Sequence, residues 1–216
     1  MRAKLINEGI ISPDNSIFRV FMQAIMDANA HKYDDPFYEI NERIKDHGIE
    51  LVDFDNYLDA IDPQEREVFK RANMVPPLGI RLFSFNSDTN TIAVLVDKTF
   101  DDKILRAPSH FLGNILRTLE PAIGHETIHR EQVSRMKKVQ SPVFRSEDDY
   151  LKNRQEVMAM AFSFVQENNK RGMNKSKIMQ MLTRPSYDPL FSKYKSLDRK
   201  TFNLFKKYAS QYAQQL

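Results

Sequence analysis

The chain has 216 residues, of which 41% are hydrophobic and 28% are charged, with a net charge of +3. These values are typical of a soluble globular protein and exclude a disordered chain. No apolar run reaches the 18 or so residues of a membrane helix, and no apolar block of a secretory signal follows the first residues. The absence of cysteine excludes disulfides and thiolate metal sites, so histidine and carboxylate are the strong ligands left for a transition metal. We therefore expect a cytoplasmic protein that does not bind membranes.

Helices are expected to dominate residues 1–75. Residues 16–30 repeat apolar side chains at helical spacing after polar residues that can cap a helix. A second helix is expected over 36–47, ended by Gly48, and a third is expected to open at Pro63.

The composition changes after residue 77. Residues 80–85 and 91–96 are β-rich runs, and the polar residues 86–90 between them are typical of a hairpin turn. A sheet of at least two strands is therefore expected. Residues 109–138 are again helical in character, and Pro121 suits the first turn of a new helix that begins near Thr118 or Leu119.

The last third is expected to be helical. The sequence from Ser146 to Asp149 resembles a capping box that opens a helix running to about Lys170. Two further helices are expected over 174–182 and 198–214, separated by a loop at 185–189.

Residues His125-Glu126-Thr127-Ile128-His129 spell His-Glu-x-x-His within an expected helix. Residues four apart lie about one turn apart on one helix face, so both imidazoles can bind one tetrahedral zinc ion. Glu126 lies on the flank of that face, where a carboxylate can reach the ion's water without binding the metal. The pattern is the signature of a zinc hydrolase. The alternative is a chance coincidence of two of the chain's five histidines.

A catalytic zinc site of this type has a third protein ligand and one open position for water. No histidine follows His129, so a downstream ligand must be Asp or Glu. Glu156 is the best candidate, because the apolar residues around it place it at the edge of a buried helix face, where a carboxylate needs a cation or a metal. The alternatives are a solvated Glu156 or an ion pair with Arg130, Arg135 or Arg154.

The expected elements resemble the gluzincin arrangement of zinc metallopeptidases. They are a hairpin, a His-Glu-x-x-His helix and a second helix that carries Glu156 after a 26-residue gap. The resemblance covers roughly residues 78–168. More narrowly, Glu156-x-x-Ala159-x-Ala161 preceded by Tyr150 resembles metallopeptidases encoded by bacteriophages and, more distantly, the ImmA/IrrE peptidases. Unlike thermolysin-like enzymes, the chain has Gln155 before Glu156 and no downstream histidine.

The resemblance implies an α+β fold, namely a mostly helical zincin-like metallopeptidase domain with a small β-sheet preceding the active-site helix. It also implies that His125, His129 and Glu156 bind Zn²⁺ and that Glu126 is the general base acting on a zinc-activated water. The substrate would be a protein or peptide. Residues 91–96 would form the edge strand that pairs with it, and the alternative is an ordinary core strand.

Stabilisation of the oxyanion in such a mechanism needs a second electrophile. Tyr150 is our candidate for this catalytic role. The alternatives are Arg154, Tyr187 and the upstream His110.

Three regions are expected within one compact domain. Residues 1–75 would be a helical region packed on a catalytic core over 76–170, and residues 171–216 a basic helical region. The expected function is that of a zinc metallopeptidase in the cytoplasm, or in the host cytoplasm or virion if a phage encodes it. The alternative is a phage structural or host-interaction protein that retains a zinc-binding peptidase-like fold without proteolysis.

Positive charge is concentrated at the end of the chain. Residues 170–216 carry a net charge of +9, against −6 for the first 169 residues. The ordinary explanation is the solvated face of amphipathic helices. Nucleic-acid binding through this region is the alternative, although no aromatic-glycine RNA-binding motif accompanies the charges.

Overall fold

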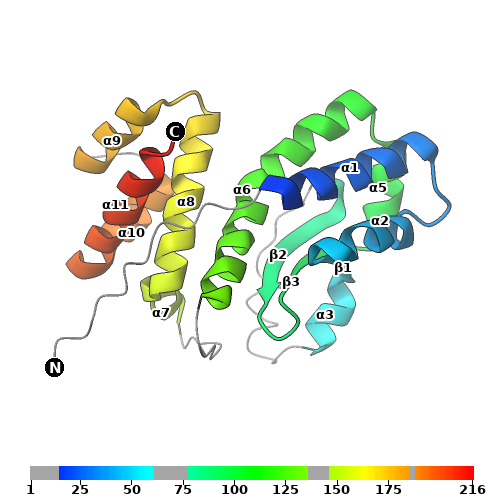
Figure 1. The fold of residues 1–216 in the computed structure, drawn as a ribbon, viewed down its shortest axis with the longest axis horizontal. Coiled ribbons are helices and arrows are strands. Elements are labelled where there is room, and N and C mark those ends of the chain that lie inside the picture. Colours follow the sequence, from blue (N-terminus) through cyan, green and yellow to red (C-terminus); the bar gives the residue numbers. More distant parts are fainter. Residues whose placement is uncertain (1–14, 61–76, 136–145, 185–187) are drawn as a thin grey trace. The chain divides into compact units, whose positions relative to one another are not determined.

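The structure is a computed structural model that describes residues 15–60, 77–135, 146–184 and 188–216 (Figure 1). It is mostly helical with one small three-stranded sheet, which confirms the α+β class. The chain forms two compact units, and the division between them falls within one helix, after Arg130. We call the described residues up to 130 the sheet unit and those from 131 onward the helical unit. None of the helices described is both long and apolar enough to cross a membrane.

The first helices of the sheet unit confirm the expectation from sequence. Helix α1 spans Asn15–His31, and α2 spans Pro36–Ile44, continued by the 3-10 helix η1 over Lys45–His47. The Asp35 side chain caps α2 by accepting from the Tyr38 N–H. Gly48 then ends the segment with a φ of 72°, a left-handed conformation that glycine adopts without a side-chain clash. The helix expected from Pro63 lies outside the described residues.

The sheet has the order β1-β3-β2. The hairpin is confirmed: β2 (Ile80–Asn86) pairs antiparallel with β3 (Thr91–Val96), and the 3-10 turn η2 (Pro77–Gly79) precedes it. Strand β1 (Ile49–Asp53) pairs parallel with β3 and leads into α3 (Phe54–Ala60). The expectation of a mainly helical segment here missed β1, because this short strand is defined by its pairing with β3, about 40 residues later in the chain.

The central position of β3 in the sheet shows whether residues 91–96 form an edge strand or a core strand. Because β3 has β1 on one side and β2 on the other, residues 91–96 form a core strand, and the expectation of a substrate-pairing edge strand at this position is wrong. Its side chains agree, since Ile92 to Val96 are all buried. Among the described strands, the edges of the sheet belong to β1 and β2.

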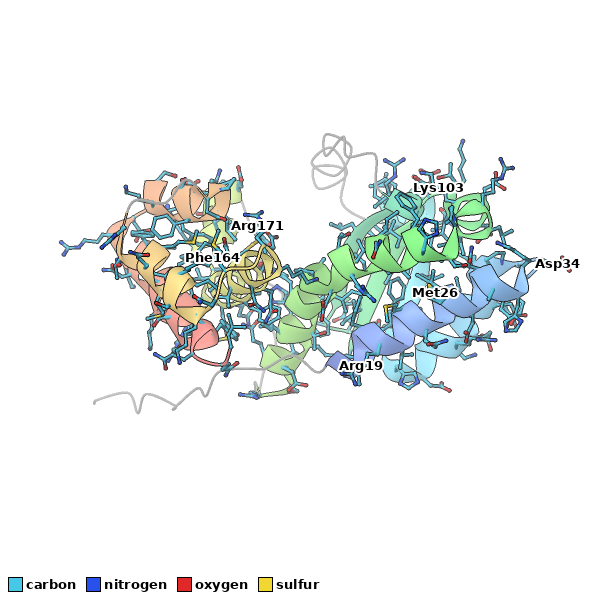
Figure 2. All side chains as sticks on the ribbon, turned by 90° about the horizontal axis from the view of Figure 1, so that it is seen from above. Arg19, Met26, Asp34, Lys103, Phe164 and Arg171 are labelled. Atoms are coloured by element: carbon cyan, nitrogen blue, oxygen red, sulfur yellow. The ribbon has the colours of Figure 1, made fainter. Side chains whose placement is uncertain are left out.

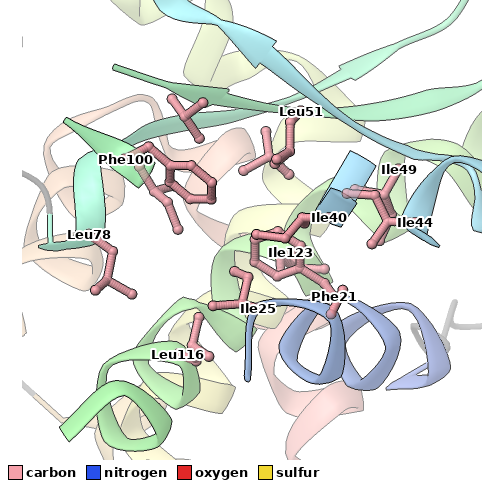
Figure 3. Close-up of a cluster of buried hydrophobic side chains, with 14 of the residues drawn as sticks. Phe21, Ile25, Ile40, Ile44, Ile49, Leu51, Leu78, Phe100, Leu116 and Ile123 are labelled. Atoms are coloured by element: carbon pink, nitrogen blue, oxygen red, sulfur yellow. The ribbon is translucent and has the colours of Figure 1, made fainter. Parts of the chain in front are cut away.

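One hydrophobic core holds the sheet unit together (Figure 3). It joins the inner face of the sheet to α1, α2, α5 (Phe100–Arg106) and α6 (Ser109–Ser134). Phe21 and Ile25 enter from α1, Ile40 from α2, and Leu116 and Ile123 from α6 (Figure 3). Packing against α6 therefore places that helix on the sheet.

Helix α6 runs without interruption through Pro121, so the expected start of a new helix near Thr118 or Leu119 is wrong. An interior proline removes one helical hydrogen bond and typically costs about 3 kcal/mol. Leu112, Leu116 and Ile123 are buried on both sides of it, and burying side chains of this size contributes roughly 1.5–3 kcal/mol each. Tertiary packing therefore outweighs the local preference, and His125 lies about four turns after the start of the helix at Ser109.

The helical unit contains five helices among its described residues. They are α7 (Glu147–Lys152), α8 (Arg154–Lys170), α9 (Lys175–Thr183), α10 (Pro189–Ser196) and α11 (Arg199–Ala213). Its interior is aromatic. Phe164 of α8, labelled in Figure 2, packs against Phe191 and Phe205 with ring centroids 6.4 and 5.5 Å apart.

The helices of this unit differ in two ways from those expected from the sequence. Ser146 caps α7 as expected, but the helix ends at Lys152 instead of running to 170. Asn153 adopts an extended conformation and caps a new helix, α8, through its side chain. Helix α10 lies within the stretch between 182 and 198, for which only a loop was expected at 185–189; Asp188 caps it and Pro189 occupies its first turn.

Candidate metal centre

The segment with the His-Glu-x-x-His sequence is helical because its other residues are core residues. Ile123, Thr127 and Ile128 are buried, and the Thr127 hydroxyl donates to the Ile123 carbonyl oxygen at 2.8 Å, which satisfies its polar group within the helix. His125 is also buried, and His129 is half-buried. The pair therefore stands on a rigid element rather than on a loop.

The two imidazoles converge on one point. The Nε2 atoms of His125 and His129 are 3.1 Å apart, and the ring planes are inclined by 74°. Two nitrogens bound to one tetrahedral zinc at about 2.0–2.1 Å lie about 3.3 Å from each other, so the observed pair fits such an ion. Without an ion, the same separation suits a hydrogen bond between the rings when one Nε2 carries the proton.

Glu126 is held on the sheet side of the helix. Its Oε2 accepts a hydrogen bond from the backbone N–H of Phe85, on β2, at 2.9 Å. The sequence showed no signal for this contact, because the donor is a backbone group whose presence does not depend on the identity of residue 85.

Arg130, one turn after Glu126 on the same face of α6, makes a second contact to the sheet unit. Its Nη1 donates to the His47 carbonyl oxygen at 3.2 Å, immediately before the chain enters β1. Glu126 and Arg130 therefore fix one helix face to the sheet, and the histidines that precede each of them lie about 100° around the helix. The arrangement presents both Nε2 atoms from one side, with the Glu126 carboxylate on the flank.

Glu156 lies in the first turn of α8 and is 8% exposed. Burial raises the pKa of Tyr194, which is fully buried, and the negative charge of Glu156 raises it further. The expected position of Glu156 at a buried helix face is therefore confirmed. His125, His129 and Glu156 are a set of buried or half-buried donors that could hold a metal ion.

The candidates for oxyanion stabilisation have different positions in the fold. Tyr150 is half-buried on α7, and Arg154 begins α8 and donates from Nε to the Tyr208 hydroxyl at 2.9 Å. Tyr187 lies outside the described residues. His110 is exposed in the first turn of α6, about 22 Å along the helix from His125. This distance excludes His110 from the centre.

The candidate centre consists of two imidazoles and two carboxylates. Two imidazoles present convergent Nε2 atoms, one carboxylate flanks them on the same helix, and a second carboxylate is buried in the helical unit. Neither protein-family models, nor curated protein sequences, nor solved structures match the chain.

Proposed function

We propose that this protein is a zinc-dependent metallopeptidase with a zincin-like centre, in which His125, His129 and Glu156 bind zinc and Glu126 is the general base. The observation that carries the proposal is the 3.1 Å separation of the two Nε2 atoms, with a carboxylate next to them on the same helix. Imidazole and carboxylate ligands are those of catalytic zinc sites with an open position.

The assignment of Glu156 as third ligand has separate support in the helical unit. Gln132, which follows His129 by three residues on α6, donates from Nε2 to the backbone oxygen of Gln155 at 3.2 Å. Gln155 directly precedes Glu156. This hydrogen bond therefore joins the last turn of α6 to the turn of α8 that carries the carboxylate. A buried carboxylate also needs a cation or hydrogen-bond donors, and a zinc ion would satisfy this requirement.

When bound, zinc would polarise the scissile carbonyl and increase the acidity of the attacking water. Glu126 takes a proton from that water as its oxygen bonds to the carbonyl carbon, and then delivers the proton to the amide nitrogen as the C–N bond breaks. The products are a carboxylic acid and an amine, so the reaction consumes one water and needs no other reactant. Tyr150 is the residue that we propose to stabilise the oxyanion.

Metal analysis tests the site. Protein purified without chelators and reconstituted with zinc should retain about one zinc per chain after gel filtration. The double substitution His125→Ala and His129→Ala should abolish this binding. Wild-type protein that retains no zinc would overturn the proposal.

Cleavage of a peptide library, followed by mass spectrometry, tests the chemistry. Loss of a general base typically lowers the rate by about 10²–10⁴-fold, so Glu126→Gln should lose cleavage while it retains zinc. The side-chain amide oxygen introduced by Glu126→Gln can still accept from the Phe85 N–H, so the fold should persist. Zinc binding without specific cleavage of any peptide or protein offered would instead favour a structural or host-interaction role for the same fold.

A further inference from the structure

The Phe85 N–H points away from β3, beyond the β2 edge of the sheet, toward Glu126 of α6. Phe85 lies opposite Ile92 in the antiparallel β2–β3 pair, and its N–H donates to the Glu126 Oε2 at 2.9 Å. In antiparallel pairs, residues alternate between those that direct N–H and C=O at the partner strand and those that direct them away. Phe85 is of the second kind, and β2 has no strand on its outer side among the described residues.

The helix that carries Glu126 is itself fixed. Arg130 donates to the His47 carbonyl oxygen next to β1, so α6 is tied near both edges of the sheet within two successive turns. Ile123, one turn before, is part of the hydrophobic core. The position of the Glu126 backbone is therefore determined independently of its side chain, and the hydrogen bond from Phe85 constrains the orientation of the carboxylate.

We propose that the Phe85 backbone N–H is a positioning group for the general base: it holds Oε2 of Glu126 and so keeps the carboxylate in the orientation from which it transfers the proton. This inference rests on the proposed peptidase function. A carboxylate anchored at one oxygen cannot rotate freely about its terminal bond. Misplacement of a catalytic group by about 1 Å can lower a rate about 10²-fold, so the anchor should contribute to kcat and not to substrate binding.

The sharpest test replaces Phe85 with 3-phenyllactic acid by nonsense suppression. This change turns the amide into an ester, which replaces the N–H with an oxygen, weakens the Ser84 carbonyl as an acceptor and keeps the aromatic ring. Phe85→Pro is a second variant, because an edge strand tolerates proline where the N–H faces away from its partner strand. The matched control is the same ester at Phe111, an exposed residue in the first turn of α6 whose N–H donates to the Pro108 carbonyl oxygen at 2.9 Å.

Both variants at position 85 should lower kcat by about 10- to 100-fold with KM within about twofold, and the Phe111 ester should leave kcat unchanged. A raised KM with unchanged kcat would overturn the inference, because it would show that the N–H binds substrate. Unchanged kcat and KM would overturn it as well. Zinc content, measured in each variant, separates these effects from loss of the metal.

The hydrogen bond can also be followed without activity, by NMR of zinc-free protein. Glu126→Ala should shift the Phe85 amide proton resonance and accelerate its exchange with solvent, whereas Glu131→Ala on the same helix should not. If Glu126→Ala leaves the resonance and the exchange rate of the Phe85 amide proton unchanged, the inference is overturned whatever the peptidase assay shows. A responsive amide in a zinc-binding protein that cleaves nothing would identify the peptidase function as the failing step, and the positioning role would fall with it.

Discussion

The Nε2 atoms of His125 and His129 lie 3.1 Å apart on successive turns of α6. This relationship depends on continuous helix between the two residues, because a spacing of four residues at 3.6 residues per turn places two imidazoles on one face. The helix is maintained through Pro121 by packing of its apolar residues against the sheet. The local sequence supplies the two imidazoles proposed as ligands, and the core of the sheet unit holds the helix that presents them.

Substitution of one histidine should weaken zinc binding strongly. His129→Ala removes one proposed ligand and should lower zinc affinity by at least about 100-fold, which exceeds the 10- to 100-fold effect typical of outer-shell partners. Competition with a chelator of known affinity measures the change. His110→Ala, an exposed histidine of the same helix, should leave the affinity unchanged. Equal affinities for wild type and His129→Ala would refute the ligand assignment.

Glu156→Gln tests the third ligand. The substitution preserves size but removes the charge that binds zinc, so zinc affinity should fall by about 100-fold or more while the far-ultraviolet circular dichroism stays that of the wild type. Glu167→Gln is the matched control, because Glu167 is exposed on the same helix, where it pairs with Arg171 at 3.5 Å. If both variants bind zinc equally well, Glu156 is not a ligand.

Glycine substitutions should have opposite effects at two positions. Gly48 has a φ of +72°, and an added Cβ would lie 2.8 Å from the Arg130 Nη1, so Gly48→Ala should destabilise the protein by roughly 1–2 kcal/mol. Gly113 is helical with open space around it, and Gly113→Ala should stabilise by roughly 0.5–1 kcal/mol. Urea unfolding measures both. Destabilisation by Gly113→Ala would contradict the open environment.

Asp97 should make stability depend on acid pH. Burial opposes its ionisation, but hydrogen bonds from Thr99 and the charge of Arg81, whose Nε lies 2.9 Å from the Asp97 Oδ2, outweigh burial and lower its pKa. Because the pKa of Asp97 is lower in the folded protein, its ionised form stabilises the fold at pH values above the unfolded-state pKa, near 3.8. This stabilisation disappears as the pH falls through the folded-state pKa.

Asp97→Asn should therefore cost roughly 1–3 kcal/mol at neutral pH, and the difference from wild type should shrink below about pH 4. Unfolding free energies measured from pH 7 to pH 2 give the comparison. A difference that stays constant over this range would show that the charge of Asp97 does not contribute.

Much of the local structure follows from the sequence, because it depends on contacts between residues close together in the chain. Helical periodicity and capping residues predict α1, α2, α9 and α11 within a few residues, and the β-rich runs on both sides of a polar turn predict the hairpin. The same local patterns predict the helical His-Glu-x-x-His segment and the burial of Glu156.

The tertiary structure decides the features that depend on distant partners. Strand β1 exists because β3 offers it backbone hydrogen bonds, and those bonds make residues 91–96 a core strand. The α6 helix crosses Pro121 because burial of its apolar face outweighs the lost helical bond. The contact of Glu126 with Phe85 spans 41 positions and uses a backbone N–H, which every residue except proline carries. Sequence alone therefore proposes the chemical groups of the candidate centre, and only the fold shows which contacts hold Glu126 and its helix in place.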